Sequence, residues 1–252
     1  MLTRMEEMLA ATADAEERHF WFRGLRRTAH ALLIQALGGH APSLIVDCGA
    51  GTGRNLDWLR EIGPAVGVEL SPTGLAVARR HGRAVAQGSV DHLPIGSGVA
   101  DVATMFDVLY CLPDDVERAA LQEIHRILKP GGVAVFNVAA LDLLKGSHST
   151  LTHELRRYTP TMLRRRMTEA GLVVERLTFT NFVTFPLVLA SRLRDQLTRR
   201  VDTSSTDDLS VPPTPVNAAL DVAMRAETLL ARRVNLPIGS SLLCVARRPR
   251  RT

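Results

Sequence analysis

The chain contains, at positions 44–55, the sequence Leu-Ile-Val-Asp-Cys-Gly-Ala-Gly-Thr-Gly-Arg-Asn. Its first residues form a short apolar run that is typical of a buried strand, and the residues after position 55 return to a helical spacing of apolar side chains. Between the two, glycines stand at alternate positions. A strand that turns on glycines into a helix presents backbone N–H groups and the positive end of a helix dipole at one point. The stretch therefore predicts a pocket for a nucleotide-like ligand.

The spacing of the glycines distinguishes between classes of nucleotide. A dinucleotide fingerprint, G-x-G-x-x-G, would place its third glycine where this chain has Arg54. The pattern is instead acidic-x-G-x-G-x-G, from Asp47 through Gly49 and Gly51 to Gly53. This pattern resembles motif I of the class I S-adenosylmethionine-dependent methyltransferases. The resemblance implies that Asp47 and the three glycines hold the methionine end of S-adenosylmethionine as cofactor.

A second stretch supports the same family. An amphipathic helix is predicted at 114–128, and its end carries Arg-Ile-Leu-Lys-Pro-Gly-Gly at 126–132, followed by an apolar strand at 133–138. This junction closely resembles the passage from helix to fifth strand in class I methyltransferases. The resemblance implies an α/β, Rossmann-like, doubly wound fold. Its seven-stranded sheet is expected to be mostly parallel, with an antiparallel last strand and a helical cap.

Further cofactor contacts are predicted after the next strands. Glu69 ends a predicted strand at 65–69, roughly 20 residues after the glycines, where a carboxylate can accept both ribose hydroxyls. Leu70 is expected against the adenine face. The segment at 88–95 resembles the family's G-D-A-x-x-L-P-F, with Ser89 in place of an aspartate that reads the adenine amino group. A hydroxyl accepts that hydrogen bond more weakly than a carboxylate. The backbone N–H of Val90 should still reach the ring, and Phe106 should lie beside the methionine portion.

The segment His-Phe-Trp-Phe-Arg-Gly at 19–24 concentrates aromatic residues in a chain where they make up only 4%. One hypothesis is that these rings fasten an N-terminal helix to the core. The other is that Trp21 and Phe22 close over the cofactor, with Arg23 or Arg26 near its carboxylate. The segment is similar to one that precedes motif I in many bacterial small-molecule methyltransferases.

The loop after the predicted fifth strand supplies the candidate catalytic residues His148, His153 and Tyr158. In an open α/β sheet, ligands bind outside the carboxyl ends of the strands, where this loop should emerge. Histidine is the commonest proton acceptor near neutral pH, so either histidine is a candidate base, with Tyr158 or Arg157 orienting the acceptor. The alternative is that the histidines cap backbone groups. The pattern is also similar to a subgroup of bacterial methyltransferases that act on natural-product or envelope-associated acceptors.

Composition narrows the classes of partner. The net charge is +5 and the pI about 9.7, but the arginines are scattered along predicted helices without interleaved aromatic rings, which disfavours a nucleic-acid partner. The three cysteines show no ligand spacing, so we expect buried thiols and no metal site. No apolar run approaches the ~20 residues that span a bilayer, so no transmembrane segment is expected. The beginning of the chain carries acidic residues, unlike a secretory signal, and a cytoplasmic protein is expected.

The predicted organisation has three parts. Residues 1–38 form an N-terminal helical cap, and residues 39–180 with 239–252 form the cofactor-binding core. Residues 181–238 form a helical insertion with a mobile linker at 201–215. The apolar faces of that insertion must be buried against the core, an acceptor, a homodimer partner or a greasy surface. A lid beside a partly apolar acceptor is the arrangement we favour.

The sequence therefore predicts a methyltransferase that transfers a methyl group by in-line displacement to a small-molecule acceptor of natural-product or envelope-associated type. Three alternatives remain at this stage. A nicotinamide-dependent reductase is disfavoured by the position of Gly53. A non-catalytic module that only binds S-adenosylmethionine is kept open by Ser89. An RNA methyltransferase is disfavoured because the chain lacks an N-P-P-Y-type tetrapeptide and a positioned Pro-Cys pair.

Overall fold

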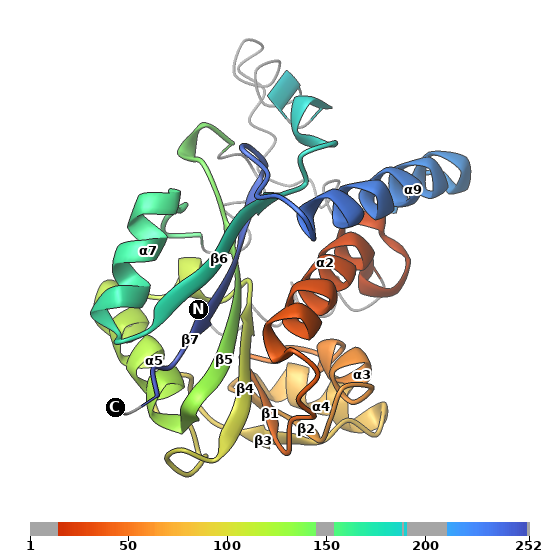
Figure 1. Ribbon diagram of the computed structural model, residues 1–252. Coiled ribbons are helices and arrows are strands. Elements are labelled where there is room, and N and C mark those ends of the chain that lie inside the picture. Colours follow the sequence, from red (N-terminus) through yellow and green to blue (C-terminus); the bar gives the residue numbers. More distant parts are fainter. Residues whose placement is uncertain (1–14, 145–153, 188, 191–210, 251–252) are drawn as a thin grey trace.

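The computed structural model describes residues 15–144, 154–187, 189–190 and 211–250. These residues contain a seven-stranded sheet with the strand order β3-β2-β1-β4-β5-β7-β6 (Figure 1). The order confirms the predicted Rossmann-like architecture. The strands are β1 (Ile45–Cys48), β2 (Ala65–Glu69), β3 (Val85–Gln87), β4 (Ala100–Phe106), β5 (Leu128–Ala139), β6 (Val173–Thr180) and β7 (Ser241–Arg247).

Strand direction brings the predicted cofactor residues to one edge. β1 is parallel to both β2 and β4, with Asp47 opposite Gly67 on one side and Thr104 on the other. β3 and β5 continue this parallel set, and β7 runs antiparallel between β5 and β6, as expected for the last strand. The carboxyl ends of β1, β2 and β4 therefore meet at the same edge, which is where open α/β sheets bind ligands.

Helices cover both faces of the sheet (Figure 1). On one face, α2 and α3 pack their apolar side chains onto β1, β4, β5 and β7. On the other face, α5 and α7 pack on the opposite side chains of the same sheet. The helices are α2 (Phe20–Leu37), α3 (Asn55–Leu59), α4 (Pro72–Arg80), α5 (Asp114–Ile127), α7 (Pro160–Glu169) and α9 (Thr214–Ala231), with short 3-10 turns η1 (Leu109–Cys111) and η2 (Asp142–Leu144).

Helix starts follow local sequence signals. The Ser71 hydroxyl accepts a hydrogen bond from the Gly74 N–H at 3.3 Å, and Pro72 occupies the first turn of α4. The Thr159 hydroxyl caps α7 in the same way, and Pro160 follows it. A serine or threonine cap with proline directly after it satisfies a free amide and presets the helical backbone.

The Lys-Pro-Gly-Gly junction differs in detail from the prediction. We expected a turn at 129–132 and a strand from 133, whereas β5 already begins at Leu128. Its pairing with β4 starts at Ala100 opposite Leu128 and shifts register before Val102 meets Val133. The glycines therefore form an irregularity in the pairing near the start of β5 and not a separate turn before it.

α2 and α9 form a close helix pair. A Cβ on Gly24 would lie 2.6 Å from the Met224 side chain, so glycine permits the approach. The hydroxyls of Thr28 and Thr228 are hydrogen-bonded across the pair at 2.9 Å. Because the inner face of α2 also belongs to the core, this helix is joined to both the sheet and α9. The expected linker positions 201–210 lie outside the described residues, and the division into cap, core and lid stays a prediction.

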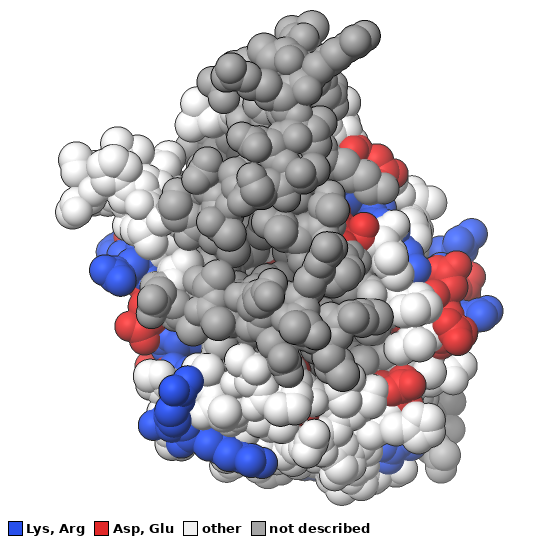
Figure 2. All heavy atoms as spheres, turned by 180° about the vertical axis from the view of Figure 1, so that it is seen from behind, with Lys and Arg blue, Asp and Glu red and all other residues white. Residues whose placement is uncertain are grey.

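The surface of the described residues carries both charges. On the face shown in Figure 2, Lys and Arg alternate with Asp and Glu along the edges, and the described residues form no broad basic surface there. Within the part of the chain that the structure describes, no helix combines the length and apolar character that a bilayer crossing requires. Cys48 and Cys244 are buried and Cys111 is partly buried, and none of the three is joined in a disulfide.

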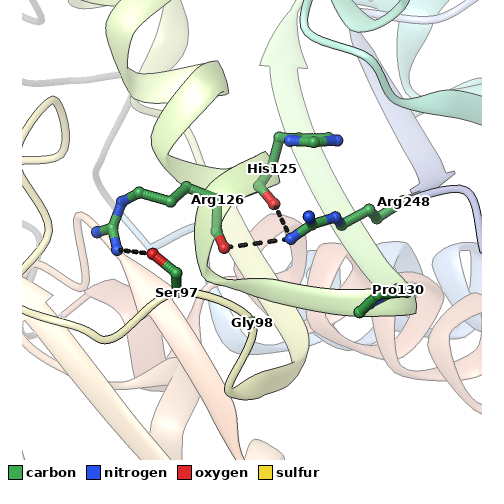
Figure 3. Close-up of a pocket in the computed structure, with 6 residues that line it drawn as sticks. All are labelled: Ser97, Gly98, His125, Arg126, Pro130 and Arg248. Carbon is green, nitrogen blue, oxygen red and sulfur yellow. Dashed lines mark hydrogen bonds between the residues drawn. The ribbon is translucent and has the colours of Figure 1, made fainter. Parts of the chain in front are cut away.

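The edge opposite the glycines is closed by arginine. Arg248 donates hydrogen bonds to the main-chain oxygens of His125 and Arg126 at 2.9 and 3.2 Å (Figure 3). It also donates to the main-chain oxygen of Leu128 at 2.6 Å. A cation at a helix C-terminus satisfies free carbonyls and opposes the helix dipole. A hollow beside it is lined by Ser97, Gly98, Pro130, His125, Arg126 and Arg248. Its arginine is already engaged by the protein, so this hollow has a structural explanation.

Candidate functional site

The glycine loop follows β1 directly. Gly49, Gly51 and Gly53 have φ angles of +77°, +55° and +71°, the left-handed region that favours glycine. A Cβ on Gly49 would lie 2.6 Å from a methyl group of Val108, which follows β4. The loop therefore turns tightly against the residue that follows β4. Glycine is required here by the left-handed backbone and by the close contact with Val108.

Asp47 is a buried carboxylate at the base of this loop. Its Oδ1 accepts a hydrogen bond from the Thr104 hydroxyl at 2.6 Å, and its Oδ2 has no partner among the described residues. Burial is the main cause that raises the pKa of Asp47 to about 7; the hydrogen bond from Thr104 and the Asn55 side chain oppose the shift, and the negative charges of Glu69 and Glu16 contribute to it. An unpartnered buried oxygen is costly unless a ligand supplies a donor. Asp47 therefore fits a ligand that brings a positively charged donor, such as an α-ammonium group.

Glu69 joins the loop to the next helix. Its two carboxylate oxygens accept hydrogen bonds from the backbone N–H groups of Gly51 and Ser71, each at 2.7 Å. A Cβ on Gly74 would lie 2.7 Å from the Gly51 carbonyl oxygen, so α4 also approaches the loop closely. A carboxylate oxygen has more than one lone pair, so both oxygens can still accept hydroxyl donors. Leu70, the next residue, is 48% exposed and available to a ring.

The predicted adenine contacts lie beside Glu69. The Gly88 N–H donates to the Glu69 main-chain oxygen at 3.1 Å, which places the segment after β3 next to β2. The Ser89 hydroxyl donates to the Asp91 carboxylate, and Ser89 pairs with His92 in an isolated bridge that leads around Val90. Asp91 therefore supplies a carboxylate close to the position where Ser89 replaces the family's aspartate. The adenine role of Ser89 and Val90 stays a prediction.

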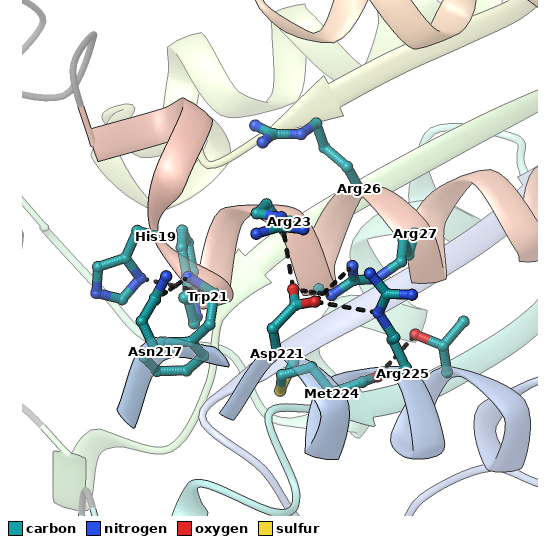
Figure 4. Close-up of polar contacts among 12 residues, drawn as sticks. His19, Trp21, Arg23, Arg26, Arg27, Asn217, Asp221, Met224 and Arg225 are labelled. Atoms are coloured by element: carbon teal, nitrogen blue, oxygen red, sulfur yellow. Dashed lines mark hydrogen bonds and ion pairs between the residues drawn. The ribbon is translucent and has the colours of Figure 1, made fainter. Parts of the chain in front are cut away.

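Phe106 and the N-terminal aromatic residues occupy different surroundings. The Phe106 ring lies 6.3 Å from Trp58 on α3, between centroids, at the carboxyl end of β4. Trp21 and Phe22 contact each other edge to face, and Trp21 also packs against the core. The Arg23 Nε lies 3.5 Å from the Asp221 carboxylate of α9 (Figure 4). The structure thus directs Arg23 toward α9, and its cofactor role stays a prediction.

Glu16 is a site residue that sequence analysis missed. Its carboxylate accepts a hydrogen bond from the Thr52 hydroxyl of the glycine loop at 2.6 Å, and Arg26 donates to its main-chain oxygen. Burial raises the pKa of Glu16, and the hydrogen bond from Thr52 opposes the shift. Nothing in the spacing of the first residues distinguishes Glu16 from solvent-exposed acids, so no motif could have identified it.

A second polar cluster lies at the carboxyl ends of β4 and β5. Asp107 has a φ of +60°, and the Asn137 side-chain amide donates to its Oδ1 at 2.8 Å. Asn137 is fully buried, and its Oδ1 has no partner among the described residues. Burial raises the pKa of Asp107 to about 7, hydrogen bonds from Asn137 and Tyr110 oppose the shift, and Glu154 adds to it. The left-handed backbone of Asp107 and the unpartnered oxygen of Asn137 lie at the same edge of the sheet. Together they indicate a binding position.

Of the three predicted catalytic residues, the structure describes only Tyr158. His148 and His153 lie outside the described residues. Tyr158 is fully buried and donates from its hydroxyl to a Glu117 carboxylate oxygen at 2.8 Å, and burial raises its pKa beyond the usual range. Arg157 donates to the Ala140 main-chain oxygen at 3.2 Å and to Glu154 at 3.0 Å. The structure gives Tyr158 a contact within the protein, and its catalytic role stays a prediction.

Known proteins match this chain over its central part. Residues 46–136 match the family described as a methyltransferase domain. A malonyl-[acyl-carrier protein] O-methyltransferase from Pectobacterium atrosepticum is 32% identical over 123 residues, 47% of each chain. The match thus spans about half the length of the curated relatives of this kind.

Solved structures match over a longer part of the chain. An S-adenosylmethionine-dependent methyltransferase from Thermotoga maritima has a TM-score of 0.63 at 19% identity and covers 98% of this chain and 99% of its own. Phosphoethanolamine N-methyltransferase 2 from Haemonchus contortus, in complex with S-adenosylmethionine, has a TM-score of 0.63 at 15% identity, over 97% of this chain and 57% of its own. At these identities the likeness shows the fold. The family match adds a similarity to a methyltransferase domain over residues 46–136.

Proposed function

We propose that this protein transfers a methyl group from S-adenosylmethionine to a small-molecule acceptor. The observation that carries the proposal is the unpartnered Oδ2 of buried Asp47, which lies at the base of the left-handed glycine loop. Glu69 is attached to the same loop through the Gly51 N–H and can accept ribose hydroxyls. S-adenosylmethionine carries both an ammonium group for Asp47 and a ribose for Glu69. A nicotinamide dinucleotide has ribose groups and lacks the ammonium group.

The charges of the site favour a cationic ligand. When bound, the cofactor supplies an electrophilic methyl carbon on a positively charged sulfur, so the transfer is an in-line displacement. Asp47 lies in β1, Glu69 ends β2 and Asp107 directly follows β4, so three neighbouring strands bring carboxyl groups to the same edge of the sheet. Negative charges in a protected site attract a sulfonium more strongly than the uncharged thioether that remains after transfer. The site would therefore bind S-adenosylmethionine more tightly than S-adenosylhomocysteine, which helps the product to leave.

Asp107 is the described residue best placed to act on the acceptor. It lies directly after Phe106 and before Val108, the residue that contacts Gly49. With a pKa raised to about 7, a share of its carboxyl groups is ionised at neutral pH and can accept a proton from a hydroxyl or amine. His148 and His153 remain alternative bases from the sequence prediction. The attack then leaves the acceptor methylated and the proton on the base.

Nearby apolar side chains favour a partly apolar acceptor. Leu143, just after β5, is 56% exposed, and Leu155 is 52% exposed. The Leu155 N–H donates to the Tyr110 main-chain oxygen at 2.9 Å, so this leucine lies beside the second polar cluster. Exposed leucines in the segment after β5 and in the segment that contacts Tyr110 suit an acceptor that carries one reactive hydroxyl or amine on an apolar body.

Two measurements test the proposal. Calorimetric titration should show one-site binding of S-adenosylhomocysteine and no binding of NADH, because only the former carries an amino-acid end for Asp47. Transfer of labelled methyl from S-adenosylmethionine to a panel of apolar phenols, alcohols and amines should then identify the acceptor chemistry. Binding of NADH in preference to S-adenosylhomocysteine would contradict the proposal.

A non-catalytic module is the second candidate, and Ser89 favours it. This residue replaces the family's aspartate and donates its hydroxyl hydrogen bond to Asp91, which weakens the adenine contact. Such a module would bind S-adenosylhomocysteine in the first measurement and transfer no label in the second. An RNA methyltransferase would instead show strongly salt-dependent binding to RNA.

A further inference from the structure

The helix α9 is apolar on the side that faces away from α2. Its inner side is buried at Met224 and Thr228, which contact α2, and the helix extends away from the sheet (Figure 1). On the outer side, Val222 is 65% exposed, Leu229 57% and Leu230 47%. At 3.6 residues per turn, the exposed apolar residues of this side form a stripe about three turns long. They are Ala219, Val222, Ala226, Leu229 and Leu230.

The apolar surface continues onto the segment after β6. The Glu227 carboxylate accepts hydrogen bonds from the backbone N–H groups of Asn181 at 2.6 Å and Val183 at 3.0 Å. Phe182, 37% exposed, and Val183, 41% exposed, therefore lie beside α9. Single exposed apolar side chains are ordinary, but a continuous apolar surface formed by a helix and its neighbour marks a place of interaction.

The exposed charges of α9 are all positive. Arg225, Arg232 and Arg233 are exposed, whereas the two acidic residues of the helix, Asp221 and Glu227, are buried. Arg225 pairs with Asp221 at 3.1 Å, and neither Arg232 nor Arg233 has a carboxylate partner among the described residues. The solvent-facing part of α9 therefore combines an apolar stripe with arginines and exposes no carboxylate.

This combination of charge and apolar surface selects the partner. A helix with an apolar face and arginines beside it binds at the interface of an anionic bilayer, because the apolar side chains enter the acyl boundary while the guanidinium groups meet lipid phosphates. A second copy of the same face would cover the leucines, but it would bring no carboxylate to the arginines. The positive end charges alone could serve the helix dipole, which leaves the exposed leucines without a role.

We propose that α9 docks this protein on an anionic lipid surface. Val222, Leu229 and Leu230 enter the interface, and Arg232 and Arg233 lie at the level of the headgroup phosphates. The helix lies on the bilayer and does not cross it. The inference goes beyond the proposed function and does not depend on it, since docking requires neither cofactor nor acceptor.

Flotation with lipid vesicles tests the apolar part of the surface. The wild type should bind vesicles of phosphatidylcholine with about 30% phosphatidylserine, and should bind pure phosphatidylcholine about 10- to 100-fold more weakly. The double variant Val222→Glu/Leu229→Glu should lose at least about tenfold in affinity, because it brings two charges into the apolar interface. Val173→Glu is the matched control. It changes a valine that is 56% exposed at the far end of β6, and should bind like the wild type.

A second pair of variants tests the charges. Arg232→Gln/Arg233→Gln should weaken binding to the anionic vesicles about 10- to 30-fold, at about fivefold for each arginine near the surface. Arg79→Gln/Arg80→Gln is the matched control, because these are also adjacent, exposed arginines at the end of a helix, α4. It should bind like the wild type. Thermal unfolding of each variant checks that the fold is retained.

Several results would overturn the proposal. They are a wild type that binds neither kind of vesicle, equal binding to both kinds, or losses in the control variants as large as those in α9. A wild-type dimer in sedimentation that Val222→Glu/Leu229→Glu dissociates would assign the surface to a second copy and overturn it too. All of these measurements are made without cofactor, so a failure of docking is separate from a failure of the proposed function.

Discussion

The carboxylates at the carboxyl ends of β1 and β2 and those on the helices α5 and α9 serve different purposes. Near β1 and β2, Asp47 and Glu69 contact the glycine loop or a neighbouring strand and keep oxygen lone pairs for a ligand. Near α5 and α9, Glu117 and Asp221 are surrounded by arginines that come from distant parts of the chain. Glu227 similarly accepts from the backbone N–H groups at 181 and 183. The first group forms a binding surface, and the second group forms structural joints.

The difference decides what each substitution should affect. Removing a carboxylate from a joint leaves buried cations without a partner and lowers stability. Removing one from the binding surface changes affinity or rate and leaves the fold largely intact. The following changes test this separation, beginning with the largest expected effect.

Glu117→Ala should cause the largest loss of stability. Glu117 is fully buried and accepts from Tyr158 at 2.8 Å and from Arg156 at 2.7 Å. Its removal leaves Arg156 with only the exposed Asp114 as its partner and leaves a free phenol in the interior, at a cost of about 3–5 kcal/mol in the free energy of unfolding. Urea unfolding measures the loss. Asp114→Ala removes a carboxylate that is 66% exposed from the same arginine, and should cost less than about 1 kcal/mol. Equal losses in the two variants would contradict the distinction.

Asp107→Asn should slow methyl transfer by about 100-fold or more, because it removes the proposed proton acceptor. The ionised carboxylate is the active form and its pKa is raised to about 7, so the wild-type rate should rise with pH through that value and level off above it. The variant should lose this rise while it still binds S-adenosylhomocysteine. The rate is measured with an acceptor that the labelled panel identifies. An unchanged pH profile would assign the base to another residue.

Gly74→Ala should weaken S-adenosylhomocysteine about 10- to 100-fold. The added methyl group would lie 2.7 Å from the Gly51 carbonyl oxygen and 3.1 Å from the Glu69 side chain, so it displaces the loop. Calorimetry measures the affinity. Gly96→Ala is the control, because its nearest neighbouring atom lies at 3.5 Å. If both variants bound S-adenosylhomocysteine like the wild type, the close contact between α4 and the glycine loop would not be needed for binding.

Ser89→Ala should have the smallest effect, a loss of about two- to tenfold in the same titration, which is the range for one neutral hydrogen bond. Its hydroxyl already donates to Asp91, which remains in the variant. Ser97→Ala, at the opposite edge of the sheet, should leave the affinity unchanged. A loss of 100-fold in Ser89→Ala would show that the hydroxyl carries the adenine contact by itself.

The same contrast explains what the sequence could predict. The glycine loop, Glu69 and the cap of α4 are encoded by residues close together in the chain, where spacing fixes the backbone and the strand order follows. The partners of Glu117 and Asp221 are separated from them by about 40 and 190 residues, and no periodic pattern connects them. Glu16 and Asn137 were missed for the same reason, since each acquires its role only when the sheet is assembled.

A structure with S-adenosylhomocysteine bound tests the central claim most directly. The ribose hydroxyls should lie within hydrogen-bond distance of the Glu69 carboxylate, and the α-ammonium should lie beside Asp47 Oδ2. Density for the ligand at another place, such as the hollow beside Arg248, would contradict the account, as would a crevice that stays empty at saturating ligand.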